Sequence, residues 1–257
     1  MAVLSDIPLG VTLFFLSIVC GLAVLLILAT GRAGRNLGET PHITRRWVMG
    51  AAGFIIVWLA ATAILAVRGK LSDWSQFPPP VIKLTMTAII LTFCYAFSRL
   101  GGRLVDGLNW ASLIGFQAFR IPVEIALYLF YHYGIIPIQM TFEGRNWDIF
   151  TGLSAIVAAW LASRNRLPQW GVWLWNLVGL GLLLNIVIVA VLSTPIPYRV
   201  FLNEPANTFI THAPYVWLPV FLVPAALFGH LLVFRKLWRT ASSSRRLQSD
   251  YLSQSTL

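Results

Sequence analysis

Charged residues, and acidic ones above all, are scarce in this sequence. Only 11% of its 257 residues are Asp, Glu, Lys or Arg, and nine are acidic, whereas soluble proteins contain about 25% charged residues. Hydrophobic residues make up 58% of the chain, and its mean hydropathy is +0.75. A soluble core cannot enclose that much apolar surface. The composition therefore excludes an ordinary soluble domain and predicts an all-α integral membrane protein.

Reactive groups are also few. The two cysteines, Cys20 and Cys94, lie within apolar runs, as expected for small buried side chains rather than for a disulfide or a metal pair. The four histidines show no metal-ligand spacing, and no GxSxG, HExxH or Walker motif is present. We therefore expect no metal and no cofactor, and the sequence favours a function other than catalysis.

Long apolar runs dominate what remains. A helix needs about 20 mostly apolar residues to cross a bilayer. Seven runs reach or approach that length, at about 7–30, 47–68, 80–99, 107–133, 148–163, 170–193 and 214–235. Because the connections are short, we predict one bundle of seven transmembrane helices over residues 1–240, followed by a polar, disordered tail at 241–257.

The basic residues are distributed unevenly between the predicted loops. Thirteen follow the first, third, fifth and seventh runs: Arg32, Arg35, Arg45, Arg46, Arg99, Arg103, Arg164, Arg166, Arg235, Lys236, Arg239, Arg245 and Arg246. The other side has four: Arg68, Lys70, Arg145 and Arg199. This bias predicts an outside N-terminus and a cytoplasmic C-terminus in a bacterial-type inner membrane. The net charge of +10 thus marks sidedness, and no nucleic-acid partner is expected.

The fourth run contains charges that lipid does not tolerate. Arg120 and Glu124 are close enough on a helix to contact each other, and Pro122 between them predicts a kink. On a helical wheel they share a stripe about 100° wide with other polar residues, and one more lies at its margin: Asn109, Gln117, Tyr128, Tyr131 and His132. Such a stripe must face protein or a water-filled space.

A second polar group is predicted at the outer mouth of the bundle. It comprises four residues of the loop after the fourth run and two residues near other spans: Glu143, Arg145, Asn146, Asp148, Lys83 and His212. Asp148 directly precedes an apolar run, where a carboxylate can cap a helix and interact favourably with its dipole. For this loop, capping and turn formation compete with ligand binding as an interpretation.

Two interpretations of the stripe remain open. Arg120 and Glu124 can form a structural ion pair that ties helices together. Alternatively, the stripe lines an outward-facing cavity that binds or transports a small polar or amphipathic ligand. In that case Arg120 binds an anionic group, and Glu124 acts as its counter-ion or as a proton carrier.

Two further function classes stay open. One is a membrane sensor or assembly scaffold that signals through the basic tail. The other is an integral-membrane enzyme acting on a lipid-like substrate, with Glu124 or His132 as acid or base. The expected partners are membrane lipids, and a small-molecule ligand, a second copy or a partner membrane protein are left open.

Overall fold

The described part of the chain is helical. The computed structural model describes the backbone of residues 7–254 and the side chains of residues 7–242, and no strand occurs within these ranges. The α-helices are α1 (Leu9–Asn36), α2 (Pro41–Val67), α3 (Pro80–Phe97), α4 (Arg99–Gly107), α5 (Trp110–Gly115), α6 (Arg120–His132), α7 (Ile149–Ser163), α8 (Gln169–Leu192) and α9 (Val223–Gln254). Short turns are the 3-10 segments η2 (Phe116–Phe119), η3 (Ile138–Met140) and η4 (Phe209–Thr211) and the π-helical η5 (Leu218–Leu222).

Six helical segments are long and apolar enough to cross a membrane: Leu9–Asn36, Pro41–Val67, Pro80–Phe97, Trp110–His132, Gln169–Leu192 and Leu218–Ser242. The predicted span at 148–163 corresponds to α7, which has only 15 residues. At 1.5 Å per residue α7 is about 22 Å long, shorter than the roughly 30 Å hydrocarbon core. By length and composition, the described residues therefore provide six candidate spans instead of the seven predicted.

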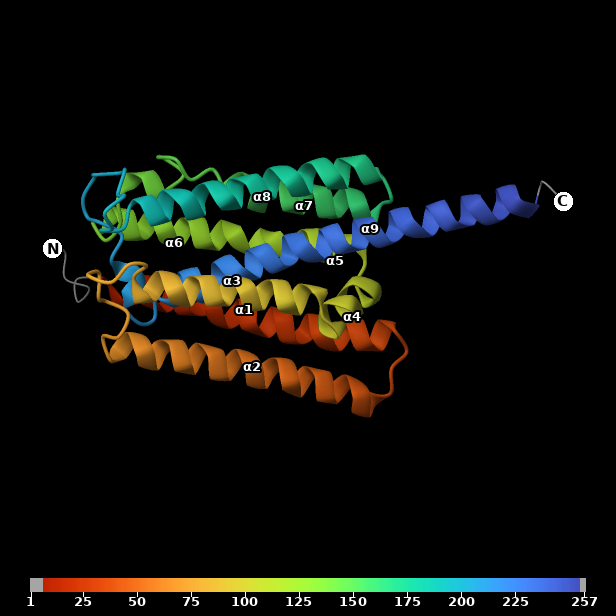
Figure 1. The fold of residues 1–257 in the computed structure, drawn as a ribbon, viewed down its shortest axis with the longest axis horizontal. Helices are drawn as coiled ribbons and strands as arrows, with labels where there is room; N and C mark the ends of the chain where they lie inside the picture. Colours follow the sequence, from red (N-terminus) through yellow and green to blue (C-terminus); the bar gives the residue numbers. More distant parts are fainter. Residues whose placement is uncertain (1–6, 255–257) are drawn as a thin grey trace.

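Helix α9 runs through the middle of the bundle, and α2 lies at its edge. Figure 1 shows α9 between the side formed by α6 and α8 and the side formed by α1 and α3, with α2 below α1. In the most apolar stretch of Leu218–Ser242, 72% of the residues are buried, against 11% in α2. Polar groups on α9 therefore have protein neighbours, because lipid contacts little of this segment.

The two ends of the bundle differ in charge. The α1–α2 and α7–α8 connections, α4 and the continuation of α9 lie at one end, and the N-terminal end of α1 and the segment 193–217 lie at the other (Figure 1). The first end, here called the basic end, carries arginines of α4 and α9: Arg99, Arg103, Arg235 and Arg239. These arginines thus gather at one end of the bundle, while the alternation of seven crossings and the sidedness of the ends remain predictions.

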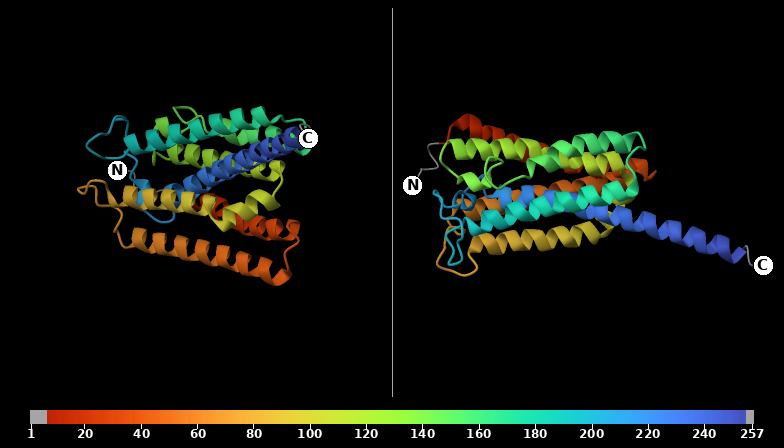
Figure 2. Two further views of the ribbon diagram at one scale, coloured as in Figure 1. Left: turned by 45° about the vertical axis from the view of Figure 1, so that its right-hand side comes forward. Right: turned by 90° about the horizontal axis from the view of Figure 1, so that it is seen from above.

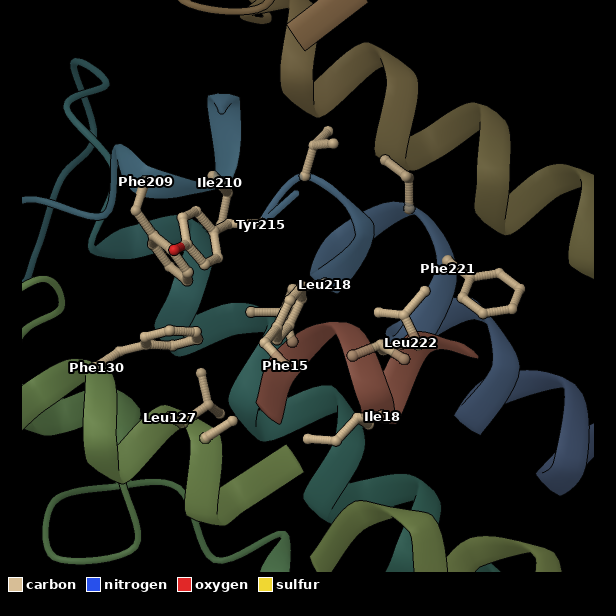
Figure 3. Packing of buried hydrophobic residues seen from close by; sticks show 14 of the residues in the cluster. Phe15, Ile18, Leu127, Phe130, Phe209, Ile210, Tyr215, Leu218, Phe221 and Leu222 are labelled. Carbon is tan, nitrogen blue, oxygen red and sulfur yellow. The ribbon is translucent and has the colours of Figure 1, made fainter. Parts of the chain in front are cut away.

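An aromatic core holds α6 in place near the end opposite the basic one (Figure 3). The ring centroid of Phe130 lies 5.8 Å from that of Phe15 and 5.2 Å from that of Tyr215. The Tyr215 hydroxyl lies 2.8 Å from the Thr12 hydroxyl, so its polar atom is satisfied inside the core. These contacts fix α6, which carries Arg120 and Glu124, against α1 and the segment that leads into α9.

Helix α4 crosses α1 at Gly107, where the two backbones are in contact. A methyl group added at Gly107 would lie 2.5 Å from the Ala33 carbonyl oxygen and 2.7 Å from its Cα. The Asn36 side-chain amide donates to the Gly107 carbonyl at 2.7 Å. Glycine is therefore required here for close approach and not for an unusual backbone angle.

We expect Gly107→Ala to destabilise the protein by about 1–3 kcal/mol, because backbone atoms must move to accommodate the methyl group. Thermal unfolding in detergent would measure the change. Gly53→Ala on α2 is the matched control, since its added methyl group meets nothing within 4 Å. Equal melting temperatures for the two variants would contradict the proposed close contact.

The C-terminal part of α9 continues past the predicted end of the last span at residue 235. Figure 2 shows its backbone leaving the bundle as a single helix. The predicted tail at 241–257 therefore overlaps α9, and residues 255–257 lie outside the described residues. The disorder of this tail stays a prediction.

Candidate functional site

The segment that carries the polar stripe is broken in its middle. The 3-10 turn η2 (Phe116–Phe119) separates α5 from α6, and α6 begins at Arg120. The turn contains Ala118, whose carbonyl would clash with the ring of Pro122 in a regular helix. Proline thus accounts for the interruption, and it places Arg120 at the start of α6 near the middle of Trp110–His132.

The loop after α6 folds into the bundle instead of staying at its outer mouth. Asn146 is 0% exposed and Asp148 is 5% exposed. The loop turns sharply at Gly144, where an added methyl group would lie 2.2 Å from the Ile138 carbonyl oxygen. Irregular backbone is tolerated at membrane depth only where protein surrounds it. The loop delivers Asp148 to the N-terminus of α7, within reach of Arg120.

Arg120 forms its ion pair with Asp148, and not with Glu124 as expected. The Arg120 Nε atom lies 2.8 Å from Asp148 Oδ2, and both side chains are buried. Among the described residues, no ion pair joins Arg120 to Glu124 within 4.0 Å. The spacing of four residues allowed that contact, but Asp148 comes closer because the preceding loop is folded inward.

His230 and Asn176 complete the surroundings of Arg120. The Arg120 Nη1 atom lies 3.2 Å from His230 Nε2, and His230 Nδ1 lies 2.8 Å from Asn176 Oδ1. Because a guanidinium can only donate, Nε2 accepts and Nδ1–H donates to the amide oxygen. The imidazole is therefore neutral, with one tautomer fixed. The Asn176 side-chain amide in turn donates to the His230 carbonyl at 3.1 Å.

Glu124 is held by the same inward-folded loop. The Asn146 side-chain amide donates to Glu124 Oε2 at 2.6 Å and to the Met140 carbonyl at 3.1 Å. Asn146 Oδ1 accepts from the backbone N–H of Asp148 at 3.1 Å. One asparagine thus links the Glu124 carboxyl group to the backbone of Asp148.

A cavity of about 210 Å³ adjoins this group. Its charged wall consists of Arg120, Glu124 and Asp148, and most of the remaining wall is apolar and comes from α3, α6, α8, η5 and α9. Met86 of α3 lines the cavity and is 53% exposed, so the cavity wall at this position is also part of the bundle surface. Drug-sized ligands occupy pockets of about 300–1,000 Å³, so this cavity suits a smaller molecule.

Two polar atoms beside the cavity have spare hydrogen-bonding capacity. Arg120 Nη2 is buried and makes no hydrogen bond to any described residue. Within the same residues, Glu124 accepts one hydrogen bond, through Oε2, which leaves Oε1 available. One donor and one acceptor therefore remain on neighbouring turns of α6. A buried polar atom without a partner is costly, which makes such atoms candidates for ligand contact.

The other predicted site residues lie apart from this group. Gln117 is buried one turn before Arg120, and its side-chain amide donates to the Ala226 carbonyl at 3.0 Å. Asn109 is exposed and caps α5 by accepting from the Ser112 N–H at 2.8 Å. Tyr128 stacks on Phe142, with ring centroids 5.0 Å apart. The remaining ones are half-buried or exposed: Tyr131, His132, Glu143, Arg145, Lys83 and His212.

Sequence reasoning missed His230 and Asn176 as members of the site. The predicted span at 214–235 puts His230 near its C-terminal end. The segment in fact runs from Leu218 to Ser242, so His230 lies at its middle. Arg120 lies near the middle of Trp110–His132, and the two residues are therefore level with each other in the bundle. A polar residue centred in an apolar segment was the available signal. No group of three potential His, Cys, Asp or Glu metal ligands occurs among the described residues.

Comparison with known proteins assigns the chain to a family. No curated protein and no solved structure matches it. A family described as "Domain of unknown function (DUF8737)" matches residues 79–238. The matched region runs from the start of α3 into α9 and includes Arg120, Asp148, Asn176 and His230, while α1 and α2 lie before it. The chain therefore belongs to the DUF8737 family, a domain of unknown function.

Proposed function

We propose that this membrane protein binds a small amphipathic ligand in the cavity beside Arg120 and Glu124. Binding of the ligand displaces a proton from the Glu124 carboxyl group. The observation that carries the proposal is the arrangement of one guanidinium and two carboxyl groups on the wall of an otherwise apolar cavity. Intramembrane ionisable groups that line a cavity are typical of substrate and proton pathways.

Charge balance narrows the ligand class. Asp148 already neutralises Arg120 through the ion pair, so an anionic ligand would bring a second negative charge to a paired guanidinium. With Glu124 ionised, the three groups sum to −1. A proton on Glu124 or a bound cation restores neutrality, which favours burial. We therefore favour a ligand with a protonated amine and an apolar body, rather than the anionic group considered from the sequence.

For the membrane arrangement we propose that α7 and the inward-folded loop before it together make a seventh crossing. The basic end then faces the cytoplasm and the N-terminus lies outside, in a bacterial-type inner membrane. The loop supports this arrangement, because it provides the length that the 15-residue α7 lacks. The cavity wall at Met86 is then directed laterally, toward lipid.

The ligand class can be tested with a matched series. Hexylammonium, hexanol and hexanoate each contain six carbons in one unbranched chain and differ in the charge of the polar end. We expect hexylammonium to raise the melting temperature of the purified protein most and hexanoate least. Glu124→Gln should lose the hexylammonium effect, whereas Glu143→Gln, at an exposed carboxyl in the loop, should keep it. A larger effect of hexanoate, or an unchanged effect in Glu124→Gln, would overturn the proposal.

The same experiment predicts a pH dependence with a definite sign. A cation that displaces one proton binds more weakly as the pH falls, by up to about tenfold per pH unit. The midpoint of hexylammonium stabilisation should therefore move to higher concentration at lower pH in the wild-type protein. In Glu124→Gln hexylammonium should give no stabilisation at any pH, and a pH-independent midpoint in the wild type would rule out proton release from Glu124.

An assembly scaffold is a second candidate, favoured by one observation. The backbone of α9 continues as a helix beyond the other helices at the basic end (Figure 2). A projecting helix can pair with a partner without any ligand. Truncation after residue 242 should then abolish complex formation, and a complex that survives the truncation would contradict the scaffold role. Hexylammonium stabilisation should be unaffected by the truncation in either case.

A further inference from the structure

A second, larger cavity starts at the basic end and lies away from Arg120. It has a volume of about 500 Å³ and lies between α2 and α3, with residues of α1, α4, η5 and α9 completing its wall. Aromatic side chains make up much of its wall: Trp47, Phe54, Trp58, Tyr95, Phe221 and Phe228. Phe54 is 38% exposed, so this groove is open on the side of α2. A groove with such walls accepts a hydrocarbon chain.

A basic pocket adjoins the groove. This pocket, of about 370 Å³, shares Ser98 and Arg99 with the groove. It is lined by four arginines from α4 and α9, Arg99, Arg103, Arg235 and Arg239, and by one carboxylate, Asp106. An apolar channel that ends in a cluster of guanidinium groups matches the two parts of a lipid with an anionic head group.

The arginines are only partly neutralised by the protein. Arg239 Nη1 lies 2.5 Å from both carboxylate oxygens of Asp106. Arg103 pairs with Glu39, and this guanidinium holds the pKa of the Glu39 carboxyl below its usual range. Among residues 7–242, two carboxylates thus face four guanidinium groups, which gives these six side chains a net charge of +2. The pocket therefore attracts an anion.

Arg103 has an unused hydrogen-bond donor that a ligand can satisfy. Its side chain is 10% exposed, and its Cζ atom lies 4.7 Å from the centroid of the Trp47 ring. Trp47 lines the groove, and Arg103 lines the basic pocket. Arg103 Nη1 is buried and makes no hydrogen bond to a described residue. A donor in this position is satisfied if a phosphate oxygen occupies the pocket.

The length of the groove agrees with one membrane leaflet. Its wall on α2 extends from Trp47 to Trp58, eleven residues along a helix, or about 16 Å at 1.5 Å per residue. Half of a hydrocarbon core of roughly 30 Å is about 15 Å. The groove begins beside Arg99, and its wall on α2 is about as long as an acyl chain in one leaflet.

We propose that the groove and the basic pocket together bind one anionic phospholipid of the surrounding membrane. Its phosphate contacts Arg99 and Arg103, and an acyl chain lies in the groove between α2 and α3. The continuity of groove and pocket favours a lipid over a soluble phosphate compound, which would fill only the pocket. The site shares no lining residue with the cavity beside Arg120, so it is independent of the proposed ligand-binding function.

The head-group contact can be tested by titrating the detergent-purified protein with phosphatidylglycerol and with phosphatidylcholine of the same acyl chains. We expect phosphatidylglycerol to raise the melting temperature at lower concentration. Arg99→Gln should weaken this effect about fivefold, the size typical of one basic residue near an anionic lipid. Arg46→Gln removes an exposed arginine at the same end that lines neither cavity, and it should leave the effect unchanged.

The acyl-chain contact needs a separate variant. Gly50 lines the groove, Gly53 does not, and a methyl group added at either meets nothing within 4 Å. Gly50→Phe should block phosphatidylglycerol stabilisation, and Gly53→Phe should not.

Four results would overturn the proposal. They are equal stabilisation by the two lipids, equal effects of Arg99→Gln and Arg46→Gln, full stabilisation by glycerol phosphate, and a lipid-independent dimer that Gly50→Phe disrupts.

Discussion

Arg120→Ala is expected to lower the unfolding free energy by about 3–5 kcal/mol, the cost of breaking a buried ion pair by removing one partner. The change leaves the buried carboxylate of Asp148 without its guanidinium, 2.8 Å away in the wild type. It also leaves His230 Nε2 without its donor. Reversible unfolding in mixed micelles would measure the loss. Arg145→Ala, in an exposed part of the loop, is the matched control and should cost no more than about 1 kcal/mol, the size of its exposed cation–π contact with Phe201.

Two double variants distinguish the partner of Arg120. Arg120→Met with Asp148→Leu removes both charges of the pair and should recover most of the lost stability, because buried ion pairs are often replaceable by apolar residues. Arg120→Met with Glu124→Leu leaves Asp148 unpaired and should not recover it. The opposite order would mean that Glu124, and not Asp148, is the partner of Arg120.

His230→Leu should have the second-largest effect, a loss of about 2–3 kcal/mol. It removes the acceptor of Arg120 Nη1 and the donor to Asn176 Oδ1, and an unsatisfied buried group costs about 1–3 kcal/mol, or more when it is charged. The same unfolding assay would detect the loss. His212→Leu, at an exposed histidine, should change stability by less than about 0.5 kcal/mol.

The effect of His230→Leu should depend on its partners. In a double-mutant cycle with Asn176→Leu, the losses should be less than additive, because each variant already breaks the hydrogen bond that the other would break. In the background of Arg120→Met with Asp148→Leu, His230→Leu should cost less than in the wild type. Additive losses in both backgrounds would show that these residues do not act as one network.

Much of the bundle follows from hydropathy, because six apolar segments are long enough to be recognised by length alone. The inward orientation of Arg120 and Glu124, each 2% exposed, also follows from the helical wheel, since lipid cannot satisfy either group. The wheel fails for Asn109 because η2 lies between it and Arg120. A 3-10 turn advances about 120° per residue, whereas the wheel assumes about 100°. Four such residues therefore rotate Asn109 away from the face that carries Arg120.

The sequence pattern does not predict which residues the tertiary fold brings into contact. Asp148 reaches Arg120 only because the loop between α6 and α7 folds inward, and hydropathy alone placed this polar loop at the surface. The depth of His230 depends on where the last segment begins, and η5 moves that start to Leu218. Local periodicity thus identifies which face is polar, but it does not identify what that face contacts.

The order of Arg120 and Asp148 along the chain also affects how the protein is inserted into the membrane during synthesis. An arginine at a helix centre costs about 2.5–3.5 kcal/mol on insertion, and Arg120 emerges from the ribosome before Asp148. At about 5–20 residues per second, the chain between them takes on the order of seconds to make. During that interval the guanidinium must be solvated by water or by the insertion machinery. The ion pair forms only when α7 folds against α6, so this half of the bundle is completed after insertion.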